Sequence, residues 1–266
     1  MAAILKEEIT NIEKLNEDIF KMTISSDYIS EFALPGQFVN IKCCDGINAI
    51  LRRPISIACV DRSKKTFDIV FQVKGIGTQY LAQKEARNGV DIIGPLGTTF
   101  DISEEHEKVA VVGGGIGTFP LYFLLNELKK SNYNSVVNAY LGFRNKNAVV
   151  LTDKFSKVCD NSIICTDDGS CGYKGLVTDL LLKDLSNMKY DIIYACGPTP
   201  MLKAVAMIAK SFGIKCQVSL EQRMGCGIGA CLVCSCKTKF KENDGWTYSR
   251  VCKDGPVFWS SDVIFE

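Results

Sequence analysis

Four cysteines near the C-terminus have the type and spacing of a redox site. Cys226, Cys231 and Cys234 follow the pattern C-x4-C-x2-C, and Cys252 comes after a further gap of 17 residues. Plant-type [2Fe–2S] sites use this spacing, with the fourth thiolate arriving from further along the chain. Such a cluster carries one electron at a time. The pattern therefore predicts an electron-transfer site.

Small residues surround the first two of these cysteines. Gly225, Gly227, Gly229 and Ala230 lie beside or between them. Residues without bulky side chains let the backbone wrap closely around a ligand, so that its N–H groups can point at sulfur. This composition strengthens the prediction of a cluster-binding loop.

Zinc and disulfides are the alternatives for these thiols. Structural zinc sites also use four thiolates, but they usually supply them as C-x2-C pairs on turns. Disulfides are typical of extracellular proteins, and residues 1–8 lack the apolar core of a signal peptide. Cys236 is a rival fourth ligand, ranked below Cys252 because the spacing places the third and fourth ligands far apart. The other cysteines are expected to be small buried residues in a reducing, cytoplasmic compartment.

A glycine run follows one predicted strand and precedes a predicted helix. Gly113, Gly114, Gly115 and Gly117 stand in this run, where backbone N–H groups can approach a pyrophosphate at the positive end of the helix. The usual dinucleotide fingerprint is incomplete, because Thr118 takes the third glycine position and no acidic residue follows about 20 positions later. A turn that merely packs tightly is the alternative.

A second turn of this kind contains Cys196, Gly197 and Pro198, again between a predicted strand and a predicted helix. Ligands of open parallel sheets bind beyond the carboxyl ends of the strands, so both turns are expected to line one crevice. Cys196 could approach a nicotinamide ring there. Equally, it could be a buried small residue before a turn.

Two motifs in the N-terminal part combine positive charge with a glycine turn. Arg53 to Ser56 supply a fixed cation and a hydroxyl on a predicted strand, and residues 74–78 form a turn that contains Gly77 and Thr78. Arginine pairs with phosphate oxygens, and the backbone of such a turn adds further donors. Each motif alone is a weak signal, but together they predict a second pyrophosphate site.

The composition is that of a globular chain without excess charge. Its 266 residues are 47% hydrophobic, with 31 Lys and Arg against 30 Asp and Glu and a formal net charge of +1. This length allows two domains and a small module. No basic run indicates a nucleic-acid surface, and no apolar stretch reaches the roughly 18 residues that span a bilayer. We therefore expect neither nucleic acid nor a membrane among its partners.

The elements that position these motifs change along the chain. Residues 1–101 show short strands between turns, which indicates an antiparallel barrel with one helix at 78–86. Residues 102–219 alternate strands and helices, which indicates a doubly wound parallel sheet with helices on both faces. Residues 220–266 form a cysteine-bearing C-terminal module. Strands are expected at 18–24, 37–42, 54–60, 66–73, 90–93, 109–112, 136–141, 162–165, 191–195 and 215–219, and further helices at 120–130, 153–158, 176–185 and 201–212.

The upstream motifs, in this order, resemble those of the ferredoxin-NADP reductase superfamily, which joins a flavin-binding barrel to a nicotinamide-binding domain. Segments 219–234 and 250–258, which include Cys252-Lys-Asp-Gly-Pro256, resemble the electron transfer subunits of NAD-dependent (type B) dihydroorotate dehydrogenases. The resemblance covers essentially the whole chain. Its most specific part is the cysteine segment.

The resemblance implies three cofactor sites. The four cysteines would hold a [2Fe–2S] cluster, NAD+ would bind at the two glycine turns, and FAD would bind the barrel with Arg53 on its pyrophosphate and Ser56 near its reactive edge. Many relatives carry an aromatic residue where Ile55 stands, so ring stacking is absent here or comes from another residue. The residues implied for FAD are Arg53, Pro54, Ile55, Ser56, Val70, Phe71, Gln72, Gly77 and Thr78, and those implied for NAD are Gly113, Gly114, Gly115, Gly117, Cys196, Gly197 and Pro198.

The resemblance also implies a partner. In this family an FMN-containing catalytic subunit oxidises dihydroorotate in pyrimidine (UMP) biosynthesis, and electrons pass through the cluster and FAD to NAD+. A heterotetramer with two of each subunit is expected, and this chain would not bind dihydroorotate itself. The alternatives are another FAD and [2Fe–2S] NAD(P)H reductase subunit, of the ferredoxin-NADP or sulfite reductase type, and a zinc-stabilised nucleotide-binding regulator. NAD rather than NADP rests on the family, because Gly142-Phe-Arg144 allows either.

No side chain stands out as a catalytic base. The single histidine, His106, lies in the acidic stretch 103–107. We expect it to be a solvated loop residue.

Overall fold

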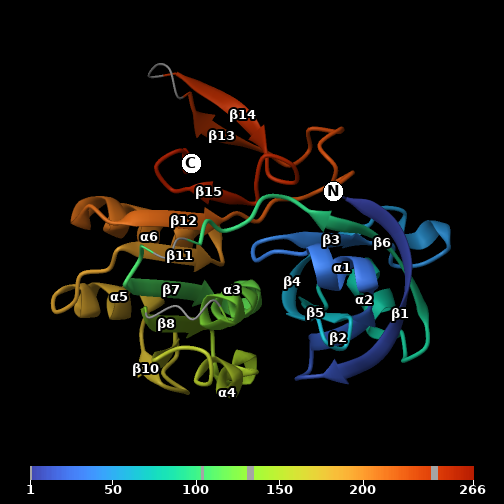
Figure 1. Ribbon diagram of the computed structural model, residues 1–266, viewed down its shortest axis with the longest axis horizontal. Helices are drawn as coiled ribbons and strands as arrows, with labels where there is room; N and C mark the ends of the chain where they lie inside the picture. Colours follow the sequence, from blue (N-terminus) through green and yellow to red (C-terminus); the bar gives the residue numbers. More distant parts are fainter. Residues whose placement is uncertain (1, 103–104, 131–134, 241–244) are drawn as a thin grey trace.

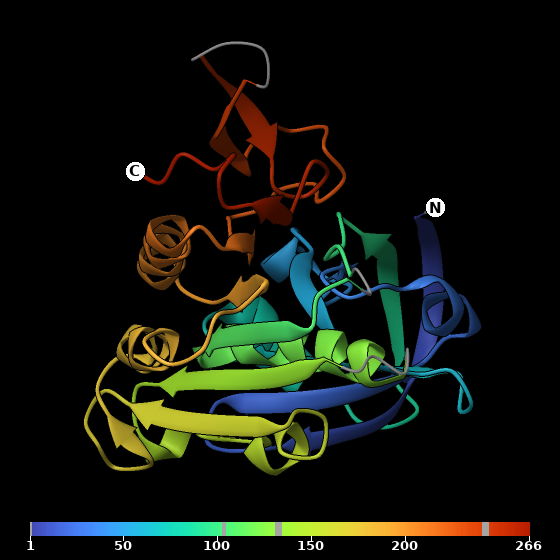
Figure 2. The same ribbon diagram turned by 60° about the vertical axis from the view of Figure 1, so that its left-hand side comes forward.

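The computed structural model describes residues 2–102, 105–130, 135–240 and 245–266. A closed antiparallel barrel is followed by a parallel sheet with helices and then by a C-terminal hairpin (Figure 1). The barrel and the sheet lie side by side, and the hairpin stands over the region where they meet (Figures 1 and 2). The predicted fold class is confirmed.

Six strands close the barrel in the order β1-β2-β5-β4-β3-β6. Alternate residues fill its interior, because successive side chains of a strand point to opposite faces; Ile9, Met22 and Ile57 are fully buried there. The sequence prediction missed β1 and the short helix α1, which the Ser26 hydroxyl caps by accepting the Ile29 N–H at 3.1 Å. The elements are β1 Ala3–Lys14, β2 Ile19–Ser25, α1 Asp27–Phe32, β3 Phe38–Ile41, β4 Arg53–Asp61, β5 Thr66–Gln72, α2 Ile76–Ala82 and β6 Gly89–Leu96.

The second sheet has seven strands in the order β10-β9-β8-β7-β11-β12-β15. Helices α5 and α6 pack on one face and α3 and α4 on the other, so the apolar central strands are buried on both sides. None of the helices in the described ranges has the length and apolar character of a membrane span. The elements before the C-terminal module are β7 Lys108–Gly114, α3 Thr118–Lys130, β8 Val136–Phe143, α4 Thr152–Phe155, β9 Asn161–Thr166, β10 Tyr173–Lys174, α5 Val177–Leu185, β11 Ile192–Cys196, α6 Thr199–Phe212 and β12 Lys215–Ser219.

The C-terminal module is tied into this sheet. Its hairpin consists of β13 (Ser235–Lys239) and β14 (Trp246–Arg250), and its last strand, β15 (Val257–Trp259), pairs antiparallel with β12. A strand of three residues is too short to give a periodic signal, so the sequence predicted only a separate appendage. The structure instead makes β15 the edge strand of the parallel sheet.

The turn before β15 joins all three parts of the chain. The Thr98 N–H, just after the barrel, donates to the Gly255 carbonyl at 2.6 Å, and the Thr98 hydroxyl donates to the Val257 carbonyl at 2.9 Å. The Leu220 N–H, just after β12, donates to the Pro256 carbonyl at 2.9 Å. The Gly-Pro of the C-terminal motif is therefore the joint between barrel, sheet and cysteine module.

We predict that Gly97→Ala weakens this joint. Gly97 has a φ of +82°, and an added Cβ would lie 2.5 Å from the Pro256 Cδ. Overpacking and backbone strain should lower the free energy of unfolding by about 1–3 kcal/mol, measured by chemical denaturation. Gly46→Ala is the control, because a Cβ there meets nothing within 4 Å. Equal losses in the two variants would contradict the assignment.

Candidate electron-transfer site

The four predicted ligand cysteines lie together as two pairs. The Cys226 N–H donates to the Cys231 Sγ at 3.3 Å, and the Cys252 N–H donates to the Cys234 Sγ at 3.4 Å. The Gly229 N–H connects the pairs by donating to the Cys252 Sγ at 3.1 Å. Within the described ranges, no three His, Cys, Asp or Glu side chains converge as a single metal ion requires. Four thiols that lie as two pairs fit a [2Fe–2S] cluster, which four thiolates hold.

Backbone N–H groups surround the sulfur of Cys226. The Sγ accepts three of them at 3.3 to 3.4 Å, from Ile228, Ala230 and Cys231. Burial opposes ionisation, but these donors together lower the pKa of the Cys226 thiol to about 6. The thiolate is the form that binds iron. The loop thus favours the thiolate form of Cys226 near neutral pH.

Arg250 fixes the turn that carries Cys252. Its guanidinium forms a double ion pair with Asp254, at 2.9 Å from Nε and 3.1 Å from Nη2, and it also donates to the Gly229 carbonyl at 3.1 Å. The N–H of the same glycine donates to Cys252, so one arginine orients both sides of this sulfur. Sequence reasoning missed this role, although opposite charges four residues apart around a predicted ligand cysteine were a visible signal.

Cys252, rather than Cys236, shares the site with Cys234. Burial and, to a lesser degree, the adjacent Cys234 raise the pKa of the Cys252 thiol to about 12. Cys236 lies on β13 in register with Ser249 and packs against the core below the hairpin. Burial raises the pKa of its thiol to about 11. This geometry favours Cys252 as the fourth ligand.

The two predicted nicotinamide turns pack directly on each other. Strands β7 and β11 are parallel neighbours, with Gly113 in register with Cys196 at their carboxyl ends. A Cβ on Gly117 would lie 2.7 Å from the Gly197 Cα, so a larger residue cannot occupy this position without a shift. The turns therefore share the edge of the sheet where ligands of this architecture bind.

The other residues of these two turns differ in how crowded and how exposed they are. A Cβ on Gly114 would strike the Met201 Sδ at 2.6 Å, whereas Gly115, at a φ of +54°, faces open space. Pro198 is exposed. Cys196 is 8% exposed, and burial, against its hydrogen bond with Ser219, raises the pKa of its thiol to about 12. The thiol is thus neutral at ordinary pH, which suits a packing residue.

The two barrel motifs also come together. The Arg53 guanidinium lies over Gly77, where an added Cβ would be 2.7 Å from the arginine Nε. The Thr78 hydroxyl donates to the Gly75 carbonyl at 2.9 Å and accepts the Lys74 N–H at 3.0 Å. Because this hydroxyl caps α2, backbone N–H groups and the arginine are what the turn can offer to a phosphate.

Some of the predicted flavin residues on β4 and β5 are buried, whereas others lie half-buried on the outer face of the barrel. Ile55, Val70 and Phe71 are 7%, 6% and 3% exposed, and Ile55 and Phe71 belong to the barrel core. Pro54 and Ser56 alternate with the core residues of β4 and are half-buried on its outer face. A ligand on this face would meet the proline and the serine. Gln72 is likewise half-buried, and its Nε2 donates to the Asp18 carboxylate at 2.6 Å.

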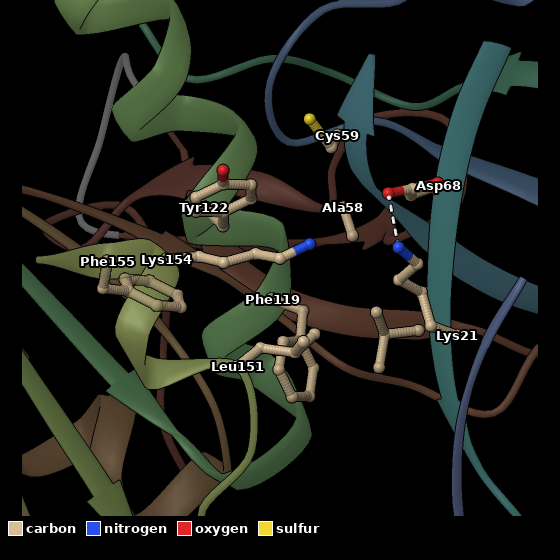
Figure 3. Close-up of a pocket in the computed structure, with 10 residues that line it drawn as sticks. Lys21, Ala58, Cys59, Asp68, Phe119, Tyr122, Leu151, Lys154 and Phe155 are labelled. Atoms are coloured by element: carbon tan, nitrogen blue, oxygen red, sulfur yellow. Dashed lines mark ion pairs between the residues drawn. The ribbon is translucent and has the colours of Figure 1, made fainter. Parts of the chain in front are cut away.

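A small pocket of about 20 Å³ opens between the barrel and α3 (Figure 3). Lys21 forms an ion pair there with Asp68 at 3.5 Å, and the Lys154 side chain extends across from α4. Of the residues predicted for FAD, only Val70 lines this pocket. It is therefore separate from the site that Arg53 and Gly77 form.

The expectation for His106 was wrong. The histidine is 6% exposed, and its backbone carbonyl accepts a hydrogen bond from the Ser135 hydroxyl. It lies two residues before the start of β7 and is buried, which local acidic composition could not reveal. Residues 103–104 of the acidic stretch lie outside the described residues.

Comparisons with known proteins decide the family. Residues 221–264 match the iron-sulfur cluster binding domain of dihydroorotate dehydrogenase B, and residues 111–207 match the oxidoreductase NAD-binding domain. The dihydroorotate dehydrogenase B (NAD(+)) electron transfer subunit of Fusobacterium nucleatum is 41% identical over 257 residues, 95% of each chain. That of Desulforamulus reducens is 37% identical over 266 residues, the whole of both. The chain belongs to this family of electron transfer subunits.

Family membership confirms the predicted activity class and cofactors: an oxidoreductase electron transfer subunit with FAD, a [2Fe–2S] cluster and NAD. A structure titled as an NADH-dependent reduced ferredoxin-NADP oxidoreductase matches with a TM-score of 0.86 and 32% identity, covering 100% of this chain and 92% of the other. A ferredoxin NADP+ reductase from Neisseria gonorrhoeae matches with a TM-score of 0.65 and 15% identity, covering 79% and 92%. This second likeness concerns the fold alone.

We predict that Gly77→Ala weakens FAD retention. The added Cβ would displace the Arg53 guanidinium, and losing a charge-assisted phosphate contact costs about 1.5–3 kcal/mol, roughly 10- to 150-fold in affinity. Arg53→Ala should have a similar effect, measured by FAD titration of the deflavinated protein. Gly75→Ala, two residues earlier, is the matched control because its Cβ meets nothing within 4 Å. Unchanged affinity in Gly77→Ala would refute this role for the arginine.

Proposed function

We propose that this chain carries electrons from an FMN-containing, dihydroorotate-oxidising subunit to NAD+. The cluster and FAD together connect the one-electron and hydride chemistries, because a flavin can exchange electrons singly or as hydride. The observation that carries the proposal is the double pair of Cys226 with Cys231 and Cys234 with Cys252, joined by the Gly229 N–H. In this proposal the four thiolates are the cluster ligands.

The barrel and the sheet hold the other two cofactors in this proposal. Arg53 and the N–H groups of the turn at Gly77 bind the FAD pyrophosphate, and Ser56, on the outer face of β4, lies near the flavin ring. The open backbone at Gly115 receives the NAD pyrophosphate, at the point where Gly117 packs on Gly197. Both sites offer backbone donors to phosphate, and Arg53 adds a fixed charge at the FAD site.

The partner surface lies on the cysteine loop. Cys231 is exposed, and three apolar side chains beside it, Ile228, Leu232 and Val233, are 52%, 62% and 58% exposed. Apolar side chains clustered at a redox centre are typical of a protein interface. We infer that the FMN subunit covers them, so that the cluster is buried between the two flavins.

The assembly we propose is a heterotetramer with two copies of each subunit. In it the FMN subunit alone binds dihydroorotate, and this chain supplies the route to NAD+. A cytoplasmic location is proposed from the cysteines, all 13 of which are free thiols here.

A second candidate function has one specific observation in its favour. The TM-score of 0.86 to the NADH-dependent reduced ferredoxin-NADP oxidoreductase structure shows that the same architecture serves another NAD(P)H reductase. The cysteine-module match and the higher identity of the curated relatives favour the dihydroorotate system.

The deciding experiment is purification of this chain together with a dihydroorotate dehydrogenase B catalytic subunit, followed by an assay of dihydroorotate-dependent NAD+ reduction. Dihydroorotate should reduce NAD+ only when both subunits are present. Activity with reduced ferredoxin and none with dihydroorotate would select the second candidate. A colourless, zinc-loaded protein from anaerobic purification would overturn both.

We predict that Cys231→Ser abolishes dihydroorotate-dependent NAD+ reduction by the complex. Flavin reduction by NADH should remain largely intact, since the cluster lies beyond FAD as seen from NADH. Cys236→Ser, at a half-buried thiol five residues away that is not a proposed ligand, should retain both activities. Loss of NADH-dependent flavin reduction in Cys231→Ser, with FAD still bound, would contradict this order of cofactors.

We also predict that Leu232→Asp weakens binding of the FMN subunit by about tenfold or more, because an apolar contact is replaced by an unpaired charge. Met207→Asp is the control, since Met207 is similarly exposed (65%) but lies on α6. Affinity is measured by titrating one subunit with the other. Equal affinities for the two variants would place the interface elsewhere.

A further inference from the structure

Asn40 lies at the contact between the barrel and the cysteine loop. It stands on β3, is 1% exposed, and its Nδ2 donates to the Cys226 carbonyl at 3.0 Å. A Cβ on Gly227 would lie 2.4 Å from this Nδ2. The glycine, at a φ of +72°, thus allows the loop to close directly on the amide.

The side chain of Asn40 shares a face with the flavin motif. The antiparallel register pairs Asn40 with Pro54 and Phe38 with Ser56. Directly opposite residues and residues two apart in a strand point to the same face. Val39, between them on β3, is fully buried in the barrel core. Asn40, Pro54 and Ser56 therefore point outward together, and the cysteine loop covers the first of the three.

Among the described residues, the side-chain amide of Asn40 has a hydrogen-bond partner for its Nδ2 but none for its Oδ1. Its Oδ1 is buried, and nothing among the described residues donates a hydrogen bond to it. An unsatisfied buried acceptor costs about 1–3 kcal/mol. Leucine has almost the same shape and would avoid this cost. The stability of the barrel therefore does not explain why an amide stands at position 40. What the amide provides and leucine could not is the hydrogen bond to the Cys226 carbonyl.

We propose that Asn40 is a positioning residue for electron transfer between the cluster and FAD. By holding the Cys226–Gly227 peptide, it fixes the first thiol pair against the face where Pro54 and Ser56 stand. In the step concerned, the reduced cluster loses one electron and the flavin gains it. Because the rate of such a transfer falls steeply with distance, a fixed separation sets the rate. This inference rests on the proposed function.

The test is Asn40→Leu in the complete complex, with the isolated chain as a second sample. The variant should keep its FAD and iron content and its rate of flavin reduction by NADH. Electron transfer between flavin and cluster, measured by rapid mixing with NADH, should be about tenfold slower or more, because without the hydrogen bond the Cys226 peptide can shift away from the flavin face. The electron paramagnetic resonance spectrum of the reduced cluster should also change, because the Cys226 peptide is released.

Two further variants complete the test. Gly227→Ala should reproduce the slow transfer, since its Cβ pushes against the Asn40 amide. Asn138→Leu is the matched control: Asn138 is 4% exposed and donates to the Tyr190 hydroxyl at 2.6 Å, but it lies on β8. It should transfer electrons at the wild-type rate.

The outcomes separate this inference from the function on which it rests. Wild-type transfer and an unchanged spectrum in Asn40→Leu would overturn the role of Asn40 alone. Loss of the cluster from both Asn40→Leu and Gly227→Ala would also overturn it, because the contact would then support cluster binding rather than transfer. Failure of NADH to reduce flavin and cluster in the wild-type chain would instead refute the proposed function.

Discussion

Backbone N–H groups that point at sulfur determine the shape of the cysteine loop. Three of them converge on Cys226 and one reaches Cys252, and the loop adopts left-handed conformations at Gly227 and Gly229 to present them. A cluster held by four thiolates carries net negative charge, and donors to its sulfurs stabilise the more reduced state. The same glycines leave room for neighbours: Asn40 lies against Gly227, and the Lys253 side chain lies against Gly229. One set of backbone angles therefore serves both the proposed ligands and the contacts that hold them.

These contacts make the cysteine module part of the body of the protein. The joint at Gly255 and Pro256 bonds to residues just after the barrel and just after β12, and β15 then continues the sheet. A relay between two cofactors requires fixed separations, because electron transfer depends steeply on distance. A module on a flexible tether would not provide them. The Arg250–Asp254 pair extends this rigidity to Cys252 itself.

The sequence predicted the elements whose signal is local. Glycine turns after apolar strands identified β7 and β11, and cysteine spacing predicted four thiols that the structure brings together, because most of each pattern lies within a few residues. The sequence could not predict contacts that join distant segments. Asn40 and Cys226 are 186 positions apart, and nothing near Asn40 marks it. Strand β15 and the burial of His106 were missed for the same reason, since both depend on which surface the chain packs against.

The incomplete dinucleotide fingerprint has a physical explanation in the same packing. Thr118, which stands where a third glycine was expected, is fully buried, and its hydroxyl donates to the Gly115 carbonyl at 2.5 Å. Gly117 instead makes the close contact between the two turns, because a Cβ there would lie 2.7 Å from the Gly197 Cα. Glycine is therefore required at position 117, where the turn at Gly197 packs, rather than at position 118. The close contact thus needs glycines from two turns that are 80 positions apart, and a fingerprint confined to one turn cannot register the second of them.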